Sequence, residues 1–136
     1  RYEDVYRLKR ERSHLPIEIN GGIKTIEQAR AQLEFVDAAM IGRASSDDPW
    51  IFGRADSTFF AERDPISTRH EAVIQHLDYL TEWQARGAKL AFLVAPMINL
   101  FSGQRNARLW RRVLSERVRK AGATPSILLE ALDTMV

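Results

Sequence analysis

The chain contains no cysteine among its 136 residues. This absence excludes a disulfide scaffold, a thiolate metal site and a cysteine nucleophile within these residues, and it fits a reducing compartment. Long apolar runs are also missing: the longest stretch, residues 90–101, is too short to span a bilayer and contains Pro96. The sequence therefore predicts no membrane association.

Acidic residues are scarce in one segment of an otherwise balanced chain. The net charge is only +2, yet residues 101–122 hold seven basic residues and one acidic residue. That segment carries +6, so the rest of the chain carries −4. A basic segment of this kind indicates a polyanionic partner.

The first part of the chain alternates between helical and strand patterns. We predict helices at residues 2–12 and 25–35, with Thr25 as the cap of the second helix. We predict strands at 17–20 and 37–42, the second buried on both faces, and then a short helix after residues 47–49. This alternation is typical of a parallel sheet with crossover helices, and two strands are too few for a stable one. These residues therefore resemble the end of a larger α/β unit.

The second part is helical throughout. Residues 53–69 mix glycine, proline, serine and charge, and we interpret them as a connection. Four helical segments follow at residues 70–87, 89–101, 104–122 and 125–136, and Pro96 should break the second. In the first of the four, the expected apolar face comprises Ile74, Leu77, Leu80 and either Trp83 or Tyr79. The predicted fold class is α/β followed by an all-α bundle.

Glycine stands at the end of each predicted strand. The first strand ends with Asn20, and Gly21 and Gly22 follow it. The second strand ends with Gly42, and Arg43 follows it. Glycine lets a ligand approach backbone N–H groups closely, and arginine supplies a fixed charge, so the pattern suits a phosphate. In (β/α)8 barrels, the loops after the last two strands often bind phosphate. The alternative is a tight turn and a surface ion pair.

Three segments taken in order resemble a known family: "INGGIKTIEQA", "DAAMIGRASSDDPWIF" and "LFSGQRNARLWRRVLSE". They are similar to the C-terminal half of bacterial tRNA-dihydrouridine synthases, and the last segment with "KAGA" is most similar to the A-type branch. The resemblance implies the last two βα units of an FMN-binding TIM barrel (residues 1–55), a linker (56–69) and a helical tRNA-binding domain (70–136).

The resemblance also implies an activity. In the family, FMN takes hydride from NADPH and passes it to a uridine of the tRNA D-loop, at positions 20 and 20a in the A-type branch. A cysteine on an upstream barrel loop donates the proton. FMN-phosphate binding would fall on Asn20, Gly21, Gly22, Gly42 and Arg43, with no catalytic residue in this chain. A cytoplasmic protein that is a monomer at full length is expected.

The third helical segment separates charge from apolar surface. On a helical wheel, Arg105, Arg108, Arg112 and Arg119 fall within roughly a 60° sector. Trp110, Leu114, Val118 and Ala121 fall on the opposite side. Arginine suits phosphate oxygens, so we predict that these four arginines bind tRNA. The alternative is a solvated charged face. Relative to the A-type pattern Gly-x-Pro-Gly-Ala-Arg, this chain reads "GQRNAR" at residues 103–108.

Other chemistry-bearing residues have simpler explanations. His70 and His76 are six residues apart, which places them on nearly opposite helix faces, so we predict no metal site. The three tryptophans occupy helical apolar positions, and we expect Trp110 in a core. Two functions other than the synthase stay open: a non-catalytic RNA-binding helical module with a vestigial barrel, and a fragment of another phosphate-binding barrel enzyme.

Overall fold

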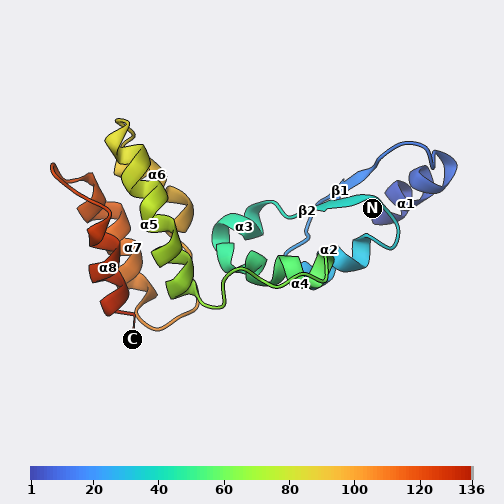
Figure 1. The fold of residues 1–136 in the computed structure, drawn as a ribbon. Coiled ribbons are helices and arrows are strands. Elements are labelled where there is room, and N and C mark those ends of the chain that lie inside the picture. Colours follow the sequence, from blue (N-terminus) through green and yellow to red (C-terminus); the bar gives the residue numbers. More distant parts are fainter. Residues whose placement is uncertain (136) are drawn as a thin grey trace.

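The computed structural model describes residues 1–135, and its elements form two groups joined by a short segment (Figure 1). The predicted order, α/β followed by all-α, is confirmed. The first group comprises α1 (Tyr2–Glu11), β1 (Glu18–Asn20), α2 (Ile26–Gln32), β2 (Ala38–Met40), α3 (Arg43–Asp47), the 3-10 helix η1 (Pro49–Arg54) and α4 (Ala55–Phe59). The second group comprises α5 (Arg69–Ala85), α6 (Leu90–Leu93), η2 (Ala95–Met97), α7 (Ala107–Glu116), η3 (Arg117–Arg119) and α8 (Ser126–Asp133). Val136, the last residue of the predicted helix 125–136, lies outside the described residues.

The two strands are parallel and in register, as predicted. Glu18 pairs with Ala38 and Asn20 with Met40. Helix α2 connects the strands, and its cap is the predicted one, since the Thr25 hydroxyl accepts a hydrogen bond from Gln28 N at 3.1 Å. Because parallel strands end at the same edge of a sheet, this register brings the segments after residues 20 and 40 together.

A carboxylate ties α1 to both strands. Asp37 Oδ2 accepts hydrogen bonds from Lys9 Nζ and from the Ile17 backbone N–H, each at 2.8 Å. The Lys9 hydrogen bond, followed by that of the Ile17 amide, lowers the pKa of Asp37 below its ordinary value. This side chain therefore fixes the starts of both strands relative to α1.

Strand β2 is not buried on both faces, so that prediction is wrong. Ala38 and Ala39 are half-buried, and Met40 is 43% exposed. A small apolar sequence becomes fully buried only where elements cover both faces, and in the described residues the sheet has two strands. The buried core of the first group is correspondingly small, and it consists of Tyr6, Ile19, Ile23, Ala29 and Val36.

Two short helices were not predicted. Helix α3 begins directly after Gly42, and α4 lies inside the segment interpreted as a connection. Both have five residues, which is too short for a helical apolar period to show in the sequence. After α4, Asp64 closes a loop by accepting hydrogen bonds from Ser57 N at 2.9 Å and Ser57 Oγ at 2.7 Å.

The helical bundle has a larger core, which joins all its principal helices. Its fully buried side chains include Val73 and Leu80 of α5, Val94, Trp110 of α7 and Leu128 of α8. The Trp110 indole N–H donates to the Met97 carbonyl at 2.9 Å, which satisfies its polar atom inside the core. The core position predicted for Trp110 is confirmed. The break at Pro96 is also confirmed, because α6 ends at Leu93 and η2 contains the proline.

The apolar face predicted for α5 is partly wrong. Ile74, Tyr79 and Trp83 are exposed by 55%, 45% and 40%, whereas Leu80 is buried and Leu77 is half-buried. The core-facing stripe also includes Val73, because α6 and α8 pack on that side of the helix. No helix of the described residues is long and apolar enough to cross a membrane.

Candidate phosphate pocket and basic surface

The two glycine-containing segments line one pocket. Asn20, Gly21, Gly22, Gly42 and Arg43 surround a hollow of about 620 Å³, together with Ile23, Lys24, Ala44 and Asp47. The five residues selected from the sequence therefore lie together at the carboxyl edge of the two strands. All five are solvent-exposed, so a ligand can reach them.

The glycine pair after β1 forms one side of this pocket with a left-handed backbone conformation. Gly21 has φ of 123° and Gly22 has φ of 75°, values that favour glycine strongly. The Tyr2 hydroxyl of α1 donates a hydrogen bond to the Gly21 carbonyl, and a Cβ at Gly22 would lie 3.6 Å from that hydroxyl. Helix α1 thus holds the turn in place from one side.

The pocket offers unused donors. Among the described residues, no backbone or side-chain acceptor binds the N–H groups of Gly22 and Gly42, which lie beyond the paired part of the strands. Main-chain amides without protein partners at a solvent-open hollow are suited to an anion. The donor set and the absence of side chains on the three glycines fit a phosphate monoester.

The charged side chains around the pocket are mostly, but not all, positive, and this balance favours an anionic ligand. Lys24 and Arg43 supply two positive side chains, and Asp47 supplies one negative side chain. Sequence analysis missed Lys24, although its place two residues after the glycine pair could have indicated it. The net positive balance fits a ligand with one phosphate group.

We expect Gly21→Ala to lower the free energy of unfolding by about 1–2 kcal/mol, because the residue must hold a left-handed backbone. Chemical denaturation measures this change. Lys24→Ala, at an exposed loop position beside the same pocket, is the control, because it replaces no glycine. Equal losses in the two variants would contradict the assigned role of the backbone conformation.

The four arginines predicted to bind RNA are all exposed but do not lie on one helix. Arg108 and Arg112 are one turn apart on α7, whereas Arg105 precedes this helix and Arg119 belongs to η3. The single 60° sector is therefore wrong, because α7 is shorter than residues 104–122. Trp110, Leu114 and Val118 are buried as predicted, but Ala121 is exposed because the chain has left the helix before it.

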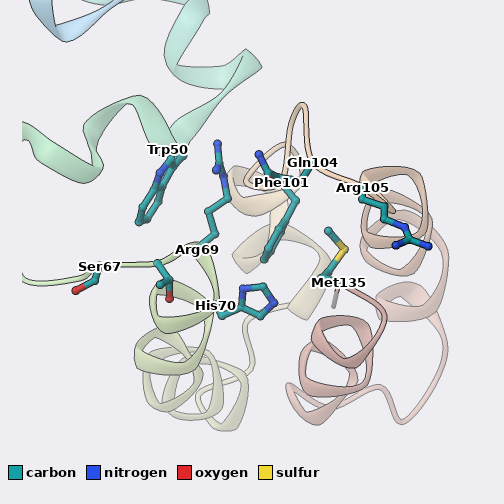
Figure 2. A pocket seen from close by; sticks show the side chains of 9 residues that line it. Trp50, Ser67, Arg69, His70, Phe101, Gln104, Arg105 and Met135 are labelled. Atoms are coloured by element: carbon teal, nitrogen blue, oxygen red, sulfur yellow. The ribbon is translucent and has the colours of Figure 1, made fainter.

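The helix starts late because of one residue. Asn106 has φ of 62°, a left-handed conformation that α-helices exclude, and α7 begins at Ala107. The side-chain amide of Asn106 also donates a hydrogen bond to the Thr134 carbonyl at 2.7 Å, which ties the loop to the end of α8. Arg105 therefore precedes α7, and it lines a second pocket of about 330 Å³ between the two groups of elements (Figure 2).

The remaining basic side chains have few acidic neighbours. Arg112 Nε lies 3.3 Å from Glu116 Oε2, but both side chains are more than half exposed, so the pair is weak. Arg117 pairs with Glu130 of α8. In the described residues Arg105, Arg108 and Arg119 form no ion pair. The exposed face of the bundle therefore carries guanidinium groups that are available to phosphate oxygens.

Comparison with known proteins shows what this chain is similar to. The profile of the family described as dihydrouridine synthase (Dus) matches residues 1–135. The chain belongs to the dihydrouridine synthase family.

Named relatives agree with this assignment. The tRNA-dihydrouridine(20/20a) synthase of Synechocystis sp. is 39% identical over 98% of this chain, and the synthase of the same name from Pasteurella multocida is 39% identical over 97%. A third, from Escherichia coli O6:H1, is 38% identical over 96%. The chain spans about 40% of the length of each of these three relatives.

Family membership gives the residue at position 106 a structural meaning. In the A-type pattern of dihydrouridine synthases quoted above, glycine stands where this chain has Asn106. Asn106 has a left-handed φ of 62°, which glycine adopts freely and asparagine adopts with less strain than most other residues. The loop before α7 therefore keeps a glycine-like conformation in spite of the substitution.

Proposed function

We propose that this chain is the C-terminal part of an FMN-dependent tRNA-dihydrouridine synthase that reduces uridine in the D-loop, at positions 20 and 20a, with NADPH as reductant. Residues 1–55 would supply the last two βα units of the TIM barrel, residues 56–69 the linker and residues 70–136 the tRNA-binding domain. The observation that carries the proposal is the convergence of residues 20–22 and 42–43 on one pocket. The names of the relatives support the activity and the tRNA partner.

The role of this chain's residues would be to hold and orient. The amides of Gly21, Gly22 and Gly42, with Arg43 and Lys24, would bind the phosphate of FMN, and Asn20 would orient the turn. When bound, the flavin supplies the hydride that reduces the uridine C5=C6 bond. The exposed arginines would hold the tRNA backbone so that a uridine reaches the flavin.

The proton has to come from outside these residues. The resemblance implies a cysteine donor on an upstream loop, and residues 1–136 contain no cysteine. This chain by itself should therefore be inactive. We propose a cytoplasmic protein, which agrees with the tRNA in the relatives' names, and we propose that it is a monomer at full length.

Purified residues 1–136 should show no flavin absorbance, because a phosphate site alone holds little of a flavin's surface. Absorption spectroscopy near 450 nm after purification measures this directly. A stably yellow preparation would contradict the proposal that the isoalloxazine contacts lie elsewhere in the protein.

The complete reading frame separates the synthase from the non-catalytic RNA-binding module. Expressed whole, a synthase should purify with FMN and form dihydrouridine in an unmodified tRNA transcript when NADPH is added. In that protein Arg43→Ala should reduce the bound flavin, whereas Arg7→Ala on α1, an exposed arginine outside the pocket, should not. Binding of tRNA without flavin or dihydrouridine would favour the module.

A further inference from the structure

Arg69 occupies an unusual position for an arginine. It is the first residue of α5, directly after the capping Thr68, and its side chain is only 18% exposed. Figure 2 shows this side chain extending from α5 beside the ring of Trp50, in the gap between the two groups of elements. It thus lies at the junction and not on the exposed basic surface.

Three different groups hold the Arg69 guanidinium. Its Nε donates to the Leu100 carbonyl at 2.7 Å, and its Nη2 lies 3.5 Å from Asp48 Oδ2. Its Cζ lies 5.3 Å from the centre of the Trp50 ring, within the range of a cation–π interaction. A planar guanidinium can satisfy a carbonyl, a carboxylate and an aromatic face together, whereas an ammonium cannot reproduce this set.

These contacts come from both sides of the junction. Asp48 and Trp50 belong to the segment that follows Gly42 and Arg43 through the short helix α3, so they are closely connected to the phosphate pocket. Leu100 belongs to the bundle core and precedes the loop to α7. A second link supports the same arrangement, because Asn99 Nδ2 donates to the Ser46 carbonyl at 2.8 Å.

We propose that Arg69 is a positioning residue. It fixes the pocket formed by residues 20–22 and 42–43 relative to the arginines of α7. This inference rests on the proposed function, since it concerns a tRNA that must contact the bundle while one of its uridines reaches the flavin. Arg69 acts through protein contacts and binds no phosphate itself. It therefore differs in kind from Arg108 and Arg112, which are exposed.

The arrangement can be measured without any RNA. Because the chain has no cysteine, Arg30→Cys on α2 and Asp78→Cys on α5 provide two unique sites for spin labels, both at exposed positions. Pulsed electron–electron double resonance should give a narrow distribution of distances between the two labels in the otherwise unaltered chain. Arg69→Ala and Arg69→Lys should each broaden this distribution at least twofold.

Arg86→Ala is the matched control. Arg86 lies just after α5, pairs with Glu82 and has its Cζ 5.1 Å from the Trp83 ring centre, so it makes similar contacts but only to residues of α5. This variant should leave the distribution narrow. A distribution of wild-type width in both Arg69 variants would overturn the proposal, and the lysine variant keeps the test valid if the alanine variant unfolds.

Binding of an unmodified tRNA transcript distinguishes positioning from direct contact. Without a fixed arrangement, fewer molecules have the conformation that binds tRNA. The affinity of the Arg69→Ala variant for tRNA should therefore fall about fivefold. Its salt dependence should stay unchanged, since no phosphate contact is removed. A flattened salt dependence that Arg69→Lys restores would overturn the proposal in favour of a phosphate contact. If the unaltered chain binds no tRNA, the proposed function fails, while the distance distributions still decide the role of Arg69.

Discussion

Replacing Arg108 and Arg112 together with alanine should weaken tRNA binding about tenfold at low salt and reduce the slope of log K against log salt by about 1.5. The two residues lie one turn apart on α7, are exposed, and project from a helix whose other side is buried around Trp110. Each phosphate contact releases counterions, and two lost contacts therefore change both quantities. Titrations at several salt concentrations measure them.

The control for this experiment has to remove equal charge elsewhere. Arg7 and Arg10 are both exposed on α1, far along the chain from the basic segment. Their double alanine variant should leave the slope unchanged if α7 is the contact. An unaltered affinity and slope in the α7 variant would remove Arg108 and Arg112 from the interface and favour the solvated charged face.

Trp110→Ala should lower the free energy of unfolding of the bundle by about 3–5 kcal/mol. Trp110 is fully buried, its ring centre lies 4.7 Å from that of Phe101, and its indole N–H is bound to the Met97 carbonyl. The substitution leaves a large cavity and removes one of the two hydrogen bonds that the Met97 carbonyl accepts, while the bond from Leu100 N remains. Urea denaturation followed by circular dichroism measures the loss.

Two further variants separate the causes of this loss. Trp110→Phe keeps most of the ring but removes the hydrogen bond, and should lower the free energy of unfolding by about 1–3 kcal/mol. Leu109→Ala on the same helix affects a side chain that is 44% exposed, so its effect should stay within about 0.5 kcal/mol. Comparable losses for Trp110→Ala and Leu109→Ala would contradict a core built around the tryptophan.

The candidate pocket could be predicted from sequence because it needs only two short glycine-containing patterns and the regular pairing of two strands. Glycine after each strand and the parallel pairing of the strands are sufficient to bring residues 20–22 and 42–43 together. Lys24 was missed because a lysine in a loop has no periodic signature, and only its place two residues after the glycine pair points to it.

The errors have tertiary causes. Helical periodicity identified α7 but not its start, which depends on the left-handed Asn106 and its bond to Thr134. The exposure of Met40 in β2 depends on how many elements cover the sheet, and the face of α5 depends on where α6 and α8 lie. The junction contacts of Arg69 join residues 21 and 31 positions apart, and no short pattern can reveal them.

The central claim is that main-chain amides after the two strands hold one phosphate, and amide chemical shifts test it most directly. In 15N-labelled protein, added FMN at millimolar concentration should shift the amides of Gly21, Gly22 and Gly42, even though such weak binding leaves the purified chain colourless. Riboflavin, which lacks the phosphate, should leave these three amides in place. Unchanged shifts with FMN, or equal shifts with riboflavin, would contradict the account.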